Sequence, residues 1–458
     1  MLIDVLRHGR ADVNRVMTPA ERAEERRLNA ATAEAAERLQ RLRTRPGDAE
    51  ALADAERGLR EARTRGESFR TTVYTAHPEL KGQRSEAPAV GGGELAAMVP
   101  DEGTALVEFS VTPEAIFVFV VTAGDPLITT VHRLAQSPEA LQRLAGDYIA
   151  ALAGRDLGFR TSGRAVSRAM LAPFEARLRG RTRLVVVPDG LVWNLPFQAL
   201  MLSDGRFVVQ QSSVTYAMSL TALREQRARA DRQDVRPRSV AAFGDPQLTR
   251  GTAGGSSAIR ADELAPLPAA AREVRALGRL YGAASRVWVG AEATEGRFKQ
   301  EAGGYAIVHV ATHGILNDAD PMSSHVLLTP SGEGVTAEDG RLQARELMTL
   351  GLDADLVVLS GCETAKGRAG QGEGVIGLTW ALFIAGVPTT VVSQWQVESE
   401  STERLMAGLH RRLAASGSAM PAEALRSSAV SMLASDQYRH PFYWAGFIVV
   451  GDGLRPLR

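Results

Sequence analysis

Cysteine and net charge are both nearly absent from this sequence. Cys362 is the only cysteine in 458 residues, which excludes an internal disulfide framework and any zinc site built from several cysteines. The 53 Lys and Arg residues balance 53 Asp and Glu residues. A zero net charge argues against a protein that binds nucleic acid or a membrane surface through its overall charge.

Long hydrophobic runs are absent as well. No stretch of about 20 apolar residues occurs, so no transmembrane helix is expected. The first residues, MLIDVLRHGR, lack the apolar core and the small-residue cleavage site of a signal peptide. We therefore expect a soluble, cytoplasmic protein. Its length allows two or three domains with a large hydrophobic core.

The first part of the chain, which we delimit as residues 1–85, predicts a helical arm. Apolar residues recur every three or four positions on both sides of the sequence RPGD at 45–48, which predicts a helical hairpin. Thr18, Pro19 and Glu21 have the pattern of an N-cap, a first helical turn and a capping-box acid. The mixed charge is typical of a solvated face, and the alternative is an arm that docks on another helical module. Residues 77–100, rich in Pro, Gly and Ala, are interpreted as a linker.

The rest of the chain predicts an α/β fold with a mostly parallel sheet covered on both faces. Continuous apolar strands such as YAIVHVATHG (305–314) and DLVVLSG (355–361) alternate with helical segments such as GVIGLTWALFIAG (374–386). The polar segment 224–236 is interpreted as an exposed connection. We divide this region into an N-terminal α/β half, residues 86–240, and a C-terminal half, residues 241–458.

Two strands of the second half end in reactive side chains. His313 follows one strand, and Cys362 follows another 49 residues later. Because reactive groups collect at the carboxyl ends of strands in such sheets, a Cys–His dyad is possible there. The imidazole would raise the small thiolate fraction of the thiol, and the amides of Gly314 and Cys362 could bind an oxyanion. The alternative for Cys362 is a small buried apolar residue.

The motifs VATHG (310–314), LSGCETA (359–365), AGVPTTVVSQWQV (385–397) and HPFYWAGFIVVGDG (440–453) resemble CHAT-domain peptidases, bacterial relatives of caspases and separase. The resemblance covers about residues 100–453. It implies a caspase-like three-layer α/β/α fold in which Cys362 is the nucleophile, His313 the general base or acid, and Gly314 with Cys362 the oxyanion hole. Such peptidases are often switched by repeat domains or partners, and some act in bacterial defence, including antiviral defence, by cleaving gasdermin-like pore formers.

The resemblance to separase also suggests a substrate pocket. In that family an acid in this region faces a basic side chain at P1, the substrate residue before the cleaved bond. The segment WQVESESTE (395–403) therefore favours cleavage after Arg or Lys. The alternative for its acids is that they stabilise a helix N-terminus. Ser360 stands where caspases have Gln, which argues against a pocket for P1 Asp. The predicted substrate-binding residues are Ser360, Glu373, Trp395, Glu398, Glu400 and Glu403.

Three other patterns carry less weight. The glycines at 372, 374 and 377 match a dinucleotide fingerprint, but they lie too far after the strand, and the loop fits better as a substrate-binding loop whose Lys366 or Arg368 can be a self-cleavage site. His309 and His313 cannot share a metal across about 13 Å of strand. His8 lies in an Arg-His-Gly sequence that lacks the βαβ context of a histidine phosphatase. No metal or cofactor is predicted.

Two functions follow as hypotheses. The first is a cysteine endopeptidase that cleaves protein or peptide substrates and is regulated by a helical or repeat module. The second is a catalytically silent or latent CHAT scaffold that acts through protein–protein interaction. No direct nucleic-acid or membrane partner is expected.

Overall fold

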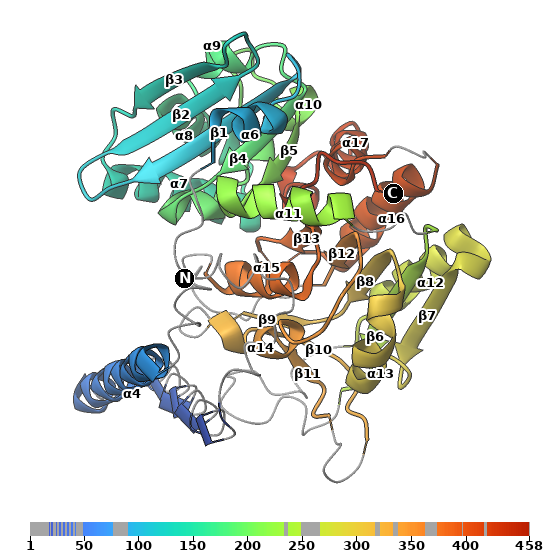
Figure 1. The fold of residues 1–458 in the computed structure, drawn as a ribbon. Coiled ribbons are helices and arrows are strands. Elements are labelled where there is room, and N and C mark those ends of the chain that lie inside the picture. Colours follow the sequence, from blue (N-terminus) through green and yellow to red (C-terminus); the bar gives the residue numbers. More distant parts are fainter. Residues whose placement is uncertain are drawn as a thin grey trace.

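The structure is a computed structural model (Figure 1). It describes parts of residues 18–42 and then residues 49–76, 90–232, 237–248, 266–316, 321–332, 338–361, 373–395, 397–415 and 419–457.

An eleven-stranded sheet runs through the molecule and is mostly parallel, as predicted. Only the neighbours β3–β2, β2–β1 and β14–β13 are antiparallel. In spatial order the strands are β3 (Ile128–Arg133), β2 (Ile116–Thr122), β1 (Thr104–Val111), β4 (Arg183–Val187), β5 (Ser213–Tyr216), β14 (Phe447–Gly451), β13 (Thr389–Ser393), β12 (Leu356–Leu359), β8 (Ile307–Ala311), β6 (Val240–Pro246) and β7 (Ser285–Gly290). Strands β8, β12 and β13 are buried along their whole length, which explains their continuous apolar sequences.

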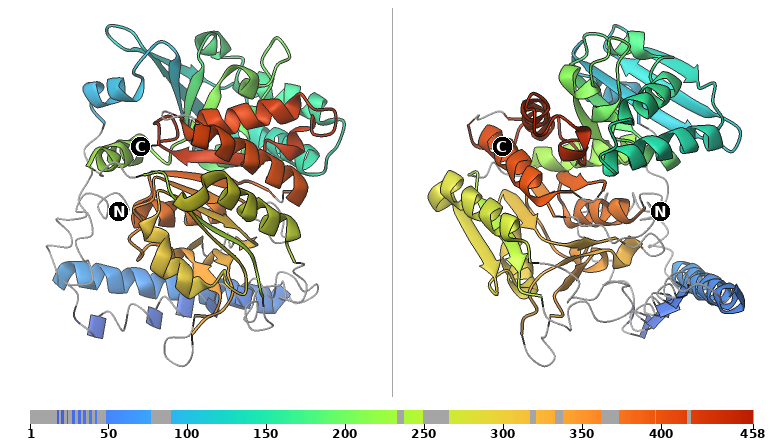
Figure 2. Two further views of the ribbon diagram at one scale, coloured as in Figure 1. Left: turned by 90° about the vertical axis from the view of Figure 1, so that its right-hand side faces the viewer. Right: turned by 180° about the vertical axis from the view of Figure 1, so that it is seen from behind.

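Helices cover both faces of this sheet, so the molecule has the predicted three-layer α/β/α arrangement (Figures 1 and 2). One face carries α7 (Pro138–Ala153), α8 (Phe159–Met170), α12 (Pro268–Tyr281), α16 (Ser399–Ala415) and α17 (Pro421–Leu433). The other carries α6 (Gly92–Met98), α11 (Leu220–Arg232) and α15 (Glu373–Ala385). Trp380 and Phe383 of α15 pack against Ala222 of α11, so α15 is a buried helix as its apolar sequence predicts. Among the described residues, no helix combines the length and the apolar character needed to span a membrane.

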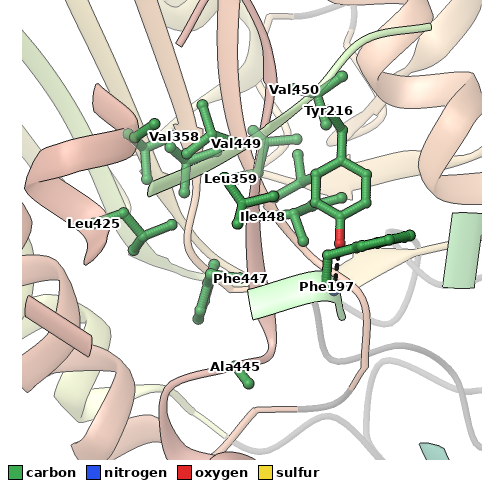
Figure 3. Close-up of a cluster of buried hydrophobic side chains, with 14 of the residues drawn as sticks. Phe197, Tyr216, Val358, Leu359, Leu425, Ala445, Phe447, Ile448, Val449 and Val450 are labelled. Atoms are coloured by element: carbon green, nitrogen blue, oxygen red, sulfur yellow. Dashed lines mark hydrogen bonds between the residues drawn. The ribbon is translucent and has the colours of Figure 1, made fainter. Parts of the chain in front are cut away.

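Strand β14 joins the two predicted halves of the sheet. It lies between β5 of the first half and β13 of the second. Buried side chains from both halves meet at this seam, including Tyr216, Leu359, Leu425 and Ile448 (Figure 3). The Tyr216 hydroxyl accepts a hydrogen bond from the Phe197 amide at 2.8 Å, which ties the segment after β4 to the seam (Figure 3). The boundary near residue 240 stays a prediction, and the sheet runs continuously across it.

Two segments differ from the sequence interpretation. The segment interpreted as a linker contains α6, whose Met98 packs with neighbouring Val99 against Leu106 and Leu223. The helix was not predicted because its few apolar residues are spread through a Gly- and Ala-rich sequence. The segment interpreted as an exposed connection belongs largely to α11, which buries Leu223 and Gln226 between its many arginines.

The N-terminal arm has a small apolar core of its own. Leu39 packs against Ala55 and Leu59 of α4 (Ala49–Ala76), as expected for a helical hairpin. The Glu21 carboxylate accepts a hydrogen bond from the Thr18 amide at 2.7 Å, and the Glu21 amide donates to the Thr18 hydroxyl at 3.2 Å. This reciprocal pair is the predicted capping box. His8 and residues 45–48 lie outside the described residues.

Candidate active site

His313 lies two residues beyond the end of β8, at the carboxyl edge of the sheet. It is 2% exposed, and the preceding Thr312 is 1% exposed. The apolar sequence of β8 places the strand in the core. The polar residues that follow it therefore lie at the carboxyl edge of the sheet. His309, by contrast, lies in the middle of the strand with its side chain fully buried, as expected for a sheet histidine.

A second, three-stranded sheet holds the backbone on both sides of His313. It consists of β9 (Gly314–Ile315), β10 (His325–Leu327) and β11 (Arg341–Gln343). The Leu327 amide donates to the His313 carbonyl at 2.9 Å, and the Thr312 hydroxyl donates to the Leu327 carbonyl at 2.6 Å. The small sheet therefore fixes the backbone at His313.

The register of β9 and β10 also orients the Gly314 amide. Gly314 faces Val326, and the bond from Leu327 to His313 marks this as a non-hydrogen-bonded pair of the antiparallel ladder. In such a pair the N–H groups point away from the partner strand. The Gly314 N–H is consequently directed away from β10.

Strand β12 ends at the same edge, shortly before the second predicted residue in the sequence. It pairs in parallel with β8, and the Ser360 amide donates to the Val310 carbonyl at 2.9 Å. Gly361 then lies directly on Thr312. A Cβ atom at Gly361 would be 2.6 Å from the Thr312 amide nitrogen and closer still to its carbonyl oxygen. The two strand ends approach so closely that only glycine fits.

Cys362 and the glycine-rich loop 363–372 lie outside the described residues. Chain continuity alone puts Cys362 next to Gly361. Glu373 is the first residue of α15, and its side chain is also outside the description.

A buried polar cluster lies beneath the two strand ends, on the face covered by α12 and α16. Glu273 of α12 accepts a 2.6 Å hydrogen bond from the Ser360 hydroxyl, and its same oxygen lies 2.6 Å from His309 Nε2. His309 Nδ1 shares a 3.0 Å hydrogen bond with His410 of α16, and Tyr281 reaches His410 from the other side at 3.2 Å. Burial, together with the electrostatic effect of the neighbouring His309, holds the pKa of His410 well below its usual range.

Ser360 therefore occupies a different place from the one predicted for a substrate contact. The residue is 1% exposed, and its hydroxyl is engaged with Glu273. Sequence reasoning missed Glu273 and His410. The signal for Glu273 was present, because it falls within the apolar stripe of α12 between Ala270 and Leu277.

The other predicted substrate-binding residues follow β13. Trp395 is 6% exposed and packs on Gly446, where a Cβ atom would be 3.1 Å from the indole nitrogen. The Glu398 carboxylate accepts a hydrogen bond from the Ser401 amide at 2.8 Å, as a helix-capping acid does. Glu400 is exposed in the first turn of α16.

Glu403 reaches a cation from the neighbouring helix. It is one turn further along α16 and pairs with Arg272 of α12 at 3.0 Å, with the two side chains 29% and 51% exposed. The helix-stabilising role thus fits Glu398, whereas Glu403 remains a partly exposed carboxylate near the same edge.

A lysine-centred cluster supports the small sheet. Lys299 of α13 (Glu295–Glu301) lies 2.8 Å from Glu295, 2.6 Å from Glu338 and 2.8 Å from Glu346. Burial opposes the charge of Lys299, but its hydrogen bonds to the three carboxylates raise its pKa overall. The carboxylates are close enough to hold a cation, and the ammonium group supplies one.

Comparisons with known proteins point to one family. The CHAT domain family matches residues 160–452, well over half of the chain. Tetratricopeptide repeat protein 28 of Homo sapiens is 26% identical over 336 residues, and that of Mus musculus 25% identical over 341 residues. Each alignment covers 64% of this chain but only 13% of the relative.

The fold is shared with separase. The Saccharomyces cerevisiae separase–securin structure aligns with a TM-score of 0.50 at 10% identity, over 78% of this chain and 30% of the separase chain. Taken with the family match, the three-layer sheet and the paired strand ends show that this chain belongs to the CHAT domain family and has the fold of caspase- and separase-like cysteine peptidases.

Proposed function

We propose that this protein is a cysteine endopeptidase in which Cys362 is the nucleophile and His313 the general base and acid. The observation that carries the proposal is the contact between Gly361 and Thr312. These residues directly precede Cys362 and His313 in the sequence, so the parallel pairing of β12 with β8 favours a dyad at this edge.

The proposed reaction uses the groups at this edge in turn. His313 takes the thiol proton, and the Cys362 sulfur attacks the scissile carbonyl carbon. The resulting oxyanion is bound by the amides of Gly314 and Cys362, for which the orientation of Gly314 away from β10 gives support. Collapse of the intermediate breaks the peptide bond as His313 protonates the leaving amine, and water then hydrolyses the thioester.

For specificity we propose cleavage after Arg or Lys, with Glu403 facing the P1 side chain. Its partly exposed carboxylate and its position on the helix that follows β13 support this role. Arg272 partly neutralises the Glu403 carboxylate in the free protein. A basic P1 side chain would therefore have to bind this carboxylate alongside Arg272 or displace the arginine. Glu398 and Glu400 are the alternatives nearer the helix N-terminus.

We further propose that the peptidase is regulated by a helical or repeat partner and acts in bacterial defence. The repeats named in the curated relatives and the apolar-cored N-terminal hairpin support the first part. The defence role rests on family resemblance alone.

A covalent probe tests the proposal. A peptide with P1 Arg and an acyloxymethyl ketone warhead should label the single cysteine of the wild-type chain, and Cys362→Ala should abolish labelling. His313→Ala should slow it by about a hundredfold or more, the scale expected when a general base is lost. Equal labelling of wild type and His313→Ala would exclude the dyad and leave the silent scaffold as the better hypothesis.

A further inference from the structure

We infer that Glu273 is a positioning residue for the dyad, holding the ends of β8 and β12 in register through His309 and Ser360. This inference rests on the proposed function, because it requires Cys362 and His313 to act together.

One carboxylate oxygen joins the two strands that carry the dyad. Glu273 Oε1 accepts a hydrogen bond from the Ser360 hydroxyl at 2.6 Å and lies 2.6 Å from His309 Nε2. Ser360 is two residues before Cys362, and His309 is four residues before His313. Any slip of one strand end along the other would break one of these hydrogen bonds.

The backbone ladder alone leaves this end of the sheet lightly held. Strand β12 is four residues long, and the Ser360 amide bond to Val310 extends its pairing with β8 by one step. Beyond it, Gly361 sets how close the strands are but supplies no side chain. The Ser360 hydroxyl is therefore the side-chain anchor that comes just before Cys362.

The anchor point itself is firmly placed. Asp245, near the end of β6, fixes the start of α12, because its carboxylate accepts a hydrogen bond from the Leu267 amide at 2.7 Å. Glu273 is 3% exposed within the apolar stripe of this helix, against β8. His410 of α16 fixes the other nitrogen of His309 at 3.0 Å, so the imidazole ring is held from both sides.

Stability alone is a weak reason for such a cluster. Burying an ionisable group costs desolvation free energy, and well-packed apolar residues often replace buried ionic groups without loss. What an apolar replacement cannot supply is a directional tie between two particular strands. The arrangement therefore suits a site where atoms must be held in a defined geometry.

The test compares variants that remove the tie with one that conserves it. Ser360→Ala removes the donor, and Glu273→Leu removes the nearer partner of a hydroxyl that also lies 3.1 Å from His309 Nε2. Glu273→Gln keeps an acceptor oxygen in the same place. The matched control is Ser428→Ala, which deletes a buried hydroxyl bonded to the Leu405 carbonyl at 2.8 Å between α16 and α17. Each chain is assayed for kcat and KM on a P1-Arg peptide, for unfolding temperature, and for the rate of iodoacetamide alkylation of its single cysteine.

We expect kcat to fall about tenfold or more in Ser360→Ala and Glu273→Leu, with KM changed less than about twofold, since the loss is in geometry and not in substrate contacts. Alkylation of Cys362 should slow in the same two variants. Glu273→Gln should recover most of kcat, and Ser428→Ala should keep it fully.

The outcomes separate this inference from the proposed function. If His313→Ala is alkylated as fast as wild type, the dyad is wrong and the positioning role falls with it. If alkylation depends on His313 but Ser360→Ala matches Ser428→Ala in kcat, only the positioning role is overturned. If Glu273→Leu fails to fold, the kcat of Ser360→Ala compared with that of Ser428→Ala still tests the positioning role.

Discussion

Gly361 and Thr312 touch backbone to backbone, and this contact joins the two strand ends that lead to Cys362 and His313. A side chain at position 361 would have to displace the backbone of Thr312, whose hydroxyl group and whose neighbour His313 are both hydrogen-bonded to Leu327. The separation of these two strand ends is thus set by a residue that has no side chain.

Gly361→Ala should nearly abolish peptidase activity and destabilise the fold. The added methyl group would lie 2.6 Å from the Thr312 amide nitrogen, and such overpacking costs about 1–3 kcal/mol. A displacement of about 1 Å at a reacting group can cost about a hundredfold in rate. Activity and urea denaturation should be measured together.

The matched control for this change is Gly146→Ala on the exposed face of α7, where an added Cβ atom would have no neighbouring atom within 4 Å. It should retain activity and gain about 0.5–1 kcal/mol of stability, because alanine is favoured over glycine within a helix. Normal activity of Gly361→Ala would contradict the packing argument.

Glu403→Gln should lower kcat/KM for a P1-Arg peptide by about ten- to a hundredfold, the value of a charged hydrogen bond, and leave a P1-Ala peptide unaffected. Arg272→Gln should act in the opposite direction, because it removes the cation 3.0 Å from Glu403. Both effects can be read from a P1-diverse peptide library. A preference for P1 Asp, or an unchanged profile in Glu403→Gln, would show that the pocket is elsewhere.

His410 should make the protein less stable in mildly acidic solution. Its pKa is lowered well below the usual value in the folded state, so the unfolded chain binds the proton more readily. This contribution to stability is intact above about pH 6.5. Below that, down to the folded pKa, it is lost by about 1.4 kcal/mol per pH unit.

Chemical denaturation of wild type and His410→Gln between pH 8 and pH 5 checks this sign. The free energy of unfolding of the variant should decline less steeply as the pH falls. The difference between the two proteins at pH 8 measures the loss of packing alone. Parallel curves for the two proteins would mean that His410 does not titrate as described.

Lys299→Met should destabilise the protein more than the removal of an exposed lysine does. It leaves Glu295, Glu338 and Glu346 close together without their common cation, and Glu295 is 1% exposed. Loss of one partner from a buried ion pair costs about 3–5 kcal/mol, and the lysine being only partly buried puts the expectation at the low end. Adding Glu338→Gln should restore part of the loss in a denaturation assay, whereas a purely additive loss would argue against the cluster.

The sequence predicts the strands and the edge at which the reactive residues gather, because continuous apolar runs bounded by glycine are strong local signals. The structure pairs β8 with β12 in parallel, although the segment between them holds β9, β10, β11 and α14, most of which was not predicted. The helices α6 and α11 escaped prediction since their few buried residues are diluted by Gly, Ala or Arg.

The polar cluster under the site could not be predicted in the same way. Ser360 reaches Glu273, 87 residues away in the sequence, and His309 reaches His410, 101 residues away. Partners so far apart in the sequence meet only because α12, which carries Glu273, and α16, which carries His410, pack on the sheet. The same sequence signal that suggested Ser360 as a pocket residue fits a residue directed into the core.

The place of β14 also bears on the order in which the protein is made. Its residues, 447–451, are synthesised long after β5 and the strands of the second half, yet they fill the gap between β5 and β13. Until that segment leaves the ribosome, the growing chain carries two unpaired strand edges, which are the surfaces most prone to aggregation. A nascent chain of this protein should therefore need protection by chaperones until β14 has been translated.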